Sequence, residues 1–169
     1  MDSEAKYANA YRQARWEFIA ACEHAGADAI SRVHPAKGPD GKALFCDSAA
    51  FGPRDATRAL LLIAGPPVTT VLNRGCALPE RTRLVVVHAL DPFAQAWGRP
   101  GVPADWPQKT LAAIAGEDLS RVRKLTVLVQ EATGVEAALA AVLPKASITI
   151  QAVTPQKAEP AILAAMDAL

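Results

Sequence analysis

Short apolar runs alternate with helix-like segments in the second half of the chain, and this alternation limits the possible folds more than any other feature. Arg83–His88 and Leu125–Gln130 are apolar runs of strand length, and Ser147–Val153 alternates apolar and polar residues. Gln108–Ala115 and Val135–Leu143, between these strands, have the composition of helices. Strands joined by helices become parallel neighbours with right-handed crossovers. This half therefore predicts a parallel sheet covered by helices.

The first half begins with a helix and continues with strands of another kind. Ser3–Ala25 repeats apolar residues at three- and four-residue steps, which predicts a helix with one apolar face. Leu44–Phe51 and Ala59–Ala64 are strand-like and are joined by the turn Gly52–Asp55, so we expect an antiparallel hairpin. Pro and Gly in His34–Gly41 predict a surface turn.

The remaining segments complete the expected architecture. Val68–Cys76 suggests a short helix, and Gln156–Leu169 a closing helix with an apolar face. Together the segments predict a three-layer α/β/α sandwich with a mixed, mostly parallel sheet of about five strands. A chain of 169 residues that is 51% apolar suits one domain with one core, spanning residues 1–169.

Composition excludes several functional classes. The formal net charge is +1, so nothing indicates a surface for nucleic acid or for an anionic membrane. No apolar run approaches the roughly 18 residues of a membrane span, and the charged segment Met1–Lys6 lacks a secretory signal. The cysteines, Cys22, Cys46 and Cys76, form no CxxC pair, which favours free thiols in a reducing compartment. We therefore expect a bacterial cytoplasmic protein.

A series of short motifs occupies the N-terminal hundred residues. In order, they are Tyr11, Ala14-Arg15, Phe18, Gly26-Ala27, His34-Pro35, Gly38-Pro39-Asp40-Gly41, Leu44, Asp47, Gly52-Pro53, Asp55-Ala56, Leu60–Gly65, His88-Ala89-Leu90-Asp91-Pro92-Phe93 and Ala96-Trp97. This series resembles a bacterial family of zinc-carboxypeptidase-like proteins of unknown function, over about residues 5–97. The resemblance implies a zinc-peptidase-like scaffold for this part of the chain.

The resemblance fails at the residues that would bind zinc. In the family, the strand similar to Leu60–Gly65 runs into a His-Gly-Val-Glu-Gly loop whose His and Glu are zinc ligands. By register, Pro67 stands here in place of the His and Thr70 in place of the Glu. Proline has no ligand atom, and a threonine hydroxyl is a poor ligand for zinc. Because these ligands are missing, we expect a peptidase-like scaffold with no metal and no cofactor.

The later parts of the family's site also lack counterparts. Family members have an Asn/Asp/Arg-rich loop after the segment similar to Trp97, whereas this chain has Gly98-Arg99-Pro100-Gly101. They are also considerably longer, and their later ligand His and general-base Glu have no evident match. Two interpretations stay open: a degenerate relative that kept the scaffold, or a related fold with a different site.

His88 is the first candidate for a site residue, because ligands of α/β sheets gather at the carboxyl ends of strands. Asp91 would orient it, and Cys76 could act as a nucleophile with His88 as the base. The alternatives are a buried histidine hydrogen-bonded to backbone and a buried free cysteine. A metal site would require His24, His34 and His88 to converge.

Three functions follow as hypotheses. The first is a non-catalytic, peptidase-like domain that acts through protein contacts. The second is a non-zinc hydrolase with a site at His88, Asp91 and Cys76. The third is a small-ligand binder that uses the cleft where zinc would have been, with Gly65, Pro67, Thr70 and His88 as lining residues.

Two further expectations concern the surface. Val135–Leu143 and Gln156–Leu169 have few bulky polar residues, which would suit burial against a second subunit or a protein partner. Asp47, Arg54 and Arg58 surround the expected hairpin, and we expect them to form a set of surface charges.

Overall fold

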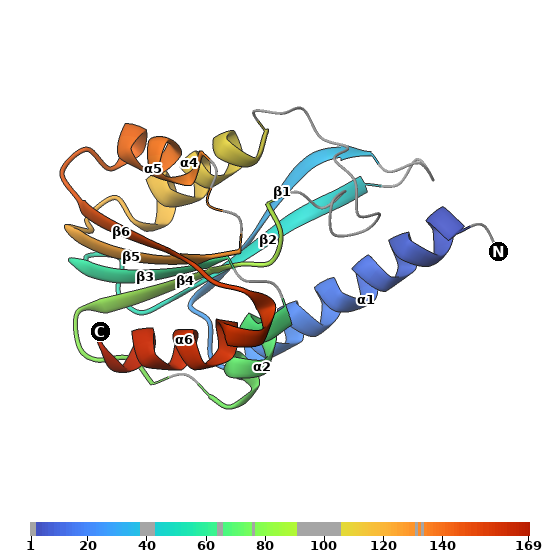
Figure 1. Ribbon diagram of the computed structural model, residues 1–169, viewed down its shortest axis with the longest axis horizontal. Coiled ribbons are helices and arrows are strands. Elements are labelled where there is room, and N and C mark those ends of the chain that lie inside the picture. Colours follow the sequence, from blue (N-terminus) through green and yellow to red (C-terminus); the bar gives the residue numbers. More distant parts are fainter. Residues whose placement is uncertain are drawn as a thin grey trace.

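Helices cover both faces of one mixed sheet, which gives a three-layer α/β/α sandwich and confirms the expected fold class (Figure 1). The computed structural model describes residues 3–37, 43–63, 66–75, 77–90, 106–130, 132 and 134–169. In chain order the elements are α1 Ser3–His24, β1 Ala29–Lys37, β2 Ala43–Phe51, β3 Arg58–Ile63, α2 Pro66–Asn73, β4 Thr82–Val87, α4 Trp106–Asp118, β5 Lys124–Val129, α5 Val135–Val142, β6 Ser147–Ala152 and α6 Pro155–Asp167.

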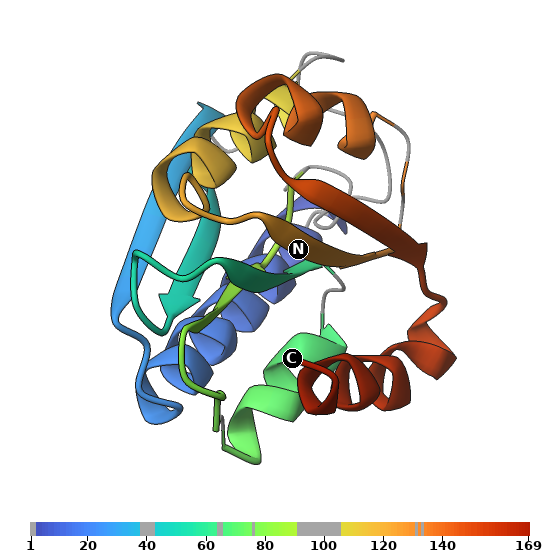
Figure 2. The same cartoon turned by 90° about the vertical axis from the view of Figure 1, so that its left-hand side faces the viewer.

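The sheet has the strand order β1-β2-β4-β3-β5-β6 among the described residues. Strands β4, β3, β5 and β6 are parallel to one another, whereas β2 is antiparallel to both β1 and β4. In Figure 2, β1 and β6 lie at opposite edges of the sheet. The described sheet thus has six strands, not about five.

The expected hairpin between the second and third strands is wrong. Strand β4 lies between β2 and β3, pairing Ala49 with Val86 on one side and Leu62 with Val86 on the other. The turn after β2 contacts β4 and does not form a hairpin with β2. Arg83 donates a hydrogen bond to the Gly52 carbonyl, and Gly52 has a φ of 89°. A Cβ on Gly52 would lie 2.3 Å from the Thr82 carbonyl oxygen, so only glycine fits this close approach.

The turn expected at His34–Gly41 is also wrong for its first four residues. These residues continue strand β1, which pairs with β2 from Ala29 to Lys37. Pro35 is tolerated because β1 is an edge strand, and the register shifts between Val33 and Ala36. Residues 38–41 lie outside the described part of the chain.

Two apolar clusters lie on the two faces of the sheet because neighbouring strand residues point to opposite sides. On β3, Leu60 packs towards α1, α2 and α6, and Leu61 packs towards α4 and α5. Every residue of β4 is buried, as expected for a central strand. No helix in the described ranges is long and apolar enough to cross a membrane.

Candidate functional site

The first turns of α2 carry the two positions where the family resemblance implies zinc ligands. Strand β3 ends at Ile63, and α2 begins only three residues later, at Pro66. Proline suits the first helical turn because its fixed φ is helical and its missing N–H would have no partner there. Pro67 and Thr70 are three residues apart, so they share one face of α2.

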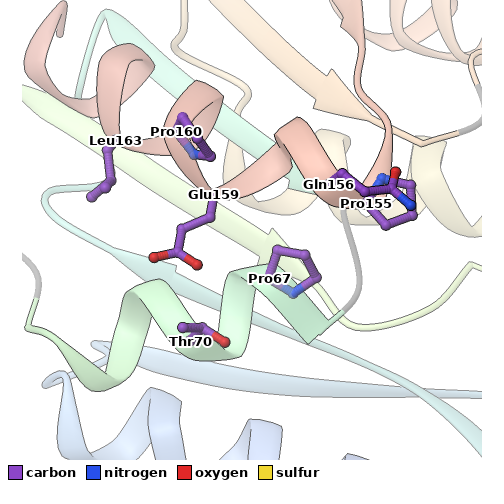
Figure 3. A pocket seen from close by; sticks show the side chains of 7 residues that line it. All are labelled: Pro67, Thr70, Pro155, Gln156, Glu159, Pro160 and Leu163. Atoms are coloured by element: carbon purple, nitrogen blue, oxygen red, sulfur yellow. The ribbon is translucent and has the colours of Figure 1, made fainter.

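This face of α2 borders a groove of about 530 Å³ between α2 and α6 (Figure 3). Pro67 and Thr70 line it from α2. From α6 it is lined by Pro155, Gln156, Glu159, Pro160 and Leu163. The structure therefore brings together two of the predicted ligand-binding residues, and it adds residues of α6, which no sequence pattern indicated.

The groove is mainly apolar and close to neutral. Glu159 points from α6 towards α2, and it forms an ion pair with Arg74 at the end of that helix. Leu163 is 37% exposed along the same groove. Among the described residues the groove therefore combines hydrocarbon surface with the polar side chains of Thr70 and Gln156, and Arg74 neutralises the carboxylate of Glu159.

The described residues do not fit a catalytic zinc ion. Such sites hold the metal with three protein ligands, chosen from His, Cys, Asp and Glu. Of the residues that line the groove, only Glu159 is of this kind, and its carboxylate is paired with Arg74. Across the described ranges, no group of three or more His, Cys, Asp or Glu side chains is placed to hold a metal ion.

His88 directly follows β4 and lies on the α1 face of the sheet, outside the groove. It is 6% exposed. Its ring stacks on Phe18 with 5.0 Å between centroids and lies 5.7 Å from the ring of Tyr11. Its backbone N–H donates to the Asp47 carbonyl at 2.9 Å. Neither ring nitrogen has a hydrogen-bond partner within the described structure.

This environment makes His88 a neutral imidazole at pH 7. Burial lowers its pKa to about 4; the nearby Asp47 carboxylate opposes this effect and Arg15 adds to it. The alternative of a buried histidine hydrogen-bonded to backbone agrees with the burial of His88 and with its main-chain N–H bond to Asp47, whereas its ring nitrogens have no partner among the described residues.

Asp47 is fully buried, so the expectation that it is a surface charge is wrong. Arg15 donates to both of its carboxylate oxygens, with Nη2 3.1 Å from Oδ1, and Arg32 lies 3.4 Å from Oδ1. The sequence does indicate that Arg15 is buried, because Tyr11, Arg15 and Phe18 follow one another at helical spacing on the buried face of α1.

The remaining predicted residues are not assembled into a site by the described structure. Gly65, Cys76 and Asp91 lie outside the described residues, so their roles stay predictions.

The two described thiols are poor candidates for nucleophiles. Cys22 and Cys46 are free and buried. Burial raises the pKa of each to about 12, and the Asp47 carboxylate adds to the effect. Both are therefore protonated at neutral pH, and a thiol is a weak nucleophile in that form.

Comparison with solved structures finds similar proteins at low sequence identity. A Bacteroides vulgatus structure described as a "putative zn-dependent exopeptidase" is 10% identical, with a TM-score of 0.52, and the match covers 98% of this chain and 94% of that one. Porphyromonas gingivalis glutaminyl cyclase is 13% identical with a TM-score of 0.41; the match covers 68% of this chain and 50% of that one. The first match shows a zinc-peptidase-like fold.

Sequence comparisons place the chain in a family. A search of curated proteins finds no significant match. The model of the family described as "Protein of unknown function (DUF2817)" matches residues 7–102, more than half of the chain. The motif series in the sequence suggested a resemblance over about residues 5–97. The chain therefore belongs to the DUF2817 family.

Proposed function

We propose that this protein is a peptidase-like scaffold without zinc-dependent hydrolysis, and that it binds a small ligand in the groove between α2 and α6. The observation that supports the proposal best is the position of Pro67 and Thr70. These residues stand where the family resemblance implies zinc ligands, and they line the groove with side chains that do not bind zinc.

The lining determines the class of ligand. Three prolines and Leu163 offer apolar surface, and Thr70 and Gln156 add a few polar atoms. A volume of about 530 Å³ falls in the range of small-molecule sites. Because Arg74 neutralises Glu159, a charged ligand gains little there. We therefore expect a short, neutral and largely apolar ligand, such as a blocked peptide.

A non-zinc hydrolase at His88 is the second candidate. It is supported by the two ring nitrogens of His88, which have no partner among the described residues at the carboxyl end of β4. Against it, the ring is 6% exposed and packs on Phe18 and Tyr11. A general base must reach the proton that it removes, and the rings of Phe18 and Tyr11 cover the His88 imidazole.

Binding to the groove is tested by NMR titration with blocked tripeptides of proline and leucine, which are neutral and apolar. We expect amide shifts confined to α2 and α6. Thr70→Arg should abolish the shifts because it places a long charged side chain in the groove. Asn73→Arg is the matched control, since Asn73 is exposed on the same helix and does not line the groove.

The same samples test the absence of hydrolysis, with peptides that carry a free carboxyl end. Intact peptides after prolonged incubation with added zinc agree with the proposal. Turnover that requires zinc would overturn it, and so would amide shifts that persist in the Thr70→Arg protein.

A further inference from the structure

The two edges of the sheet differ in how they are protected. Unpaired edge strands are templates for further pairing, and proteins protect them with charges, proline or bulges. Strand β1 has all three devices: Arg32 and Lys37, Pro35, and the register shift between Val33 and Ala36. Strand β6, Ser147–Ala152, has the sequence SITIQA, with no charge and no proline, and keeps an unbroken register with β5.

The outward backbone groups of β6 follow from its pairing with β5. Ser147 N–H donates to the Arg123 carbonyl, and Val153 N–H donates to the Val129 carbonyl. Alternate residues of a strand direct their N–H and C=O groups to opposite sides. The groups of Ile148, Ile150 and Ala152 therefore point away from β5, where no described strand pairs with them.

We propose that these groups pair with β6 of a second copy of the chain, in antiparallel register about a two-fold axis at Ile150. The register places Ile150 opposite its own copy and Ile148 opposite Ala152. All six outward N–H and C=O groups of each strand are then hydrogen-bonded, and two six-stranded sheets become one continuous sheet.

A second copy fits this edge better than an unrelated charged segment. Identical strands that meet about a two-fold axis bring like side chains together, and like charges opposite each other are destabilising. An uncharged strand is free of this penalty, and Ile150 would gain an apolar cross-strand partner. A charged partner would find no complementary charge on β6.

The neighbouring helix leaves room for such a contact. Helix α6 packs on β3 and β5 and borders α2 through its groove face. The exposed residues on the side of α6 opposite that groove are Lys157, Ala164 and Ala168, by helix geometry. Figure 2 shows α6 on the β6 side of α2. Towards the C-terminal end of α6 the exposed side chains of this flank, Ala164 and Ala168, are small and allow a second subunit to approach the edge.

Light scattering after size-exclusion chromatography tests the pairing. The chain has a mass of 17.8 kDa, and we expect twice that mass for the wild-type protein. The proposed register places Thr149 opposite Gln151 of the other copy, and both are exposed. Thr149→Lys/Gln151→Lys therefore sets like charges against each other and should give a folded monomer. Thr149→Lys/Gln151→Glu sets opposite charges against each other and should stay a dimer.

A control variant adds the same charge elsewhere. Gln13→Lys/Ala20→Lys alters two exposed positions of α1 and should leave the dimer intact. Cooperative unfolding of each variant, followed by circular dichroism, checks that it folds. A monomeric wild-type protein would overturn the proposal, as would a dimer that survives the Lys/Lys change. If Thr149→Lys/Gln151→Lys and Thr149→Lys/Gln151→Glu both lose the dimer, the proposed register is wrong. None of these results depends on ligand binding in the α2–α6 groove, which the NMR titration measures separately.

Discussion

At the scale of single residues, His88 is the most unusual position of the described structure. Each ring nitrogen that lacks a partner there forfeits a hydrogen bond with water, which costs about 1–3 kcal/mol. Packing on Phe18 and Tyr11 offsets part of that cost. Because the ring is neutral at pH 7, its charge can appear only when the pH falls.

We predict that His88 makes the protein less stable in acid. Its pKa is 6.5 in the unfolded chain and about 4 in the folded protein, so between these values the unfolded chain binds more protons. Stability should therefore fall as the pH decreases from 6.5 to 4, by about 3 kcal/mol from this group at roughly 1.4 kcal/mol per pKa unit.

Urea unfolding of the wild-type and His88→Leu proteins at pH 7 and pH 4.5 measures this contribution. The variant should be about as stable as the wild type at pH 7, because it removes two unpaired polar atoms. It should lose less stability on acidification, since other groups titrate equally in both proteins. The same acid loss in both proteins would show that His88 does not titrate as described.

The buried Arg15–Asp47 pair shows what periodicity can and cannot reveal. The spacing of Tyr11, Arg15 and Phe18 indicates that Arg15 lies on the buried face of α1. Its partner lies 32 residues away on β2. Nothing local in the sequence identifies Asp47 as that partner, so the sequence alone left it among the surface charges.

At the scale of elements, the sequence predicted the strands and helices better than their pairing. The central strand β4 and the parallel strands β5 and β6 follow directly from apolar runs and alternation. The choice of β4 as the partner of β2 depends on contacts distant in sequence, above all Arg83 with Gly52. For β1, Pro35 indicated a loop, because the edge position that tolerates it was not visible.

Arg83 also joins β4 to α4, and we predict that this link is essential for stability. Its Nη2 lies 3.1 Å from the Asp118 carboxylate, and both side chains are buried. Asp118→Ala should destabilise the fold by about 3–5 kcal/mol, because it leaves the guanidinium charge buried without its ion-pair partner. Chemical denaturation measures the loss.

A second variant separates charge burial from packing. Arg83→Met/Asp118→Leu replaces the pair with apolar side chains and should recover most of the stability lost in Asp118→Ala. If the double variant is as unstable as the single one, the position requires the ion pair itself. In the Arg74–Glu159 pair, Arg74 is exposed and Glu159 is only partly buried, so Glu159→Gln should cost less than about 1 kcal/mol and serves as the control.

At the scale of the whole molecule, the fold resembles that of a zinc peptidase, whereas the function that we propose does not use zinc. The chain belongs to the DUF2817 family and has a zinc-peptidase-like fold. The positions that the resemblance assigns to zinc line a neutral groove instead. The scaffold was predictable because its short motifs keep their order along the chain. The groove was not, since five of its seven lining residues come from α6, about ninety residues after Pro67.

We propose that the scaffold has no zinc site, and the metal content of the purified protein tests this most directly. Protein saturated with zinc, dialysed against metal-free buffer and measured by elemental analysis should contain far less than one zinc per chain. Pro67→His/Thr70→Glu, which restores the two side chains that the family resemblance implies, should retain more metal than the wild type. One tightly held zinc per wild-type chain would contradict the account.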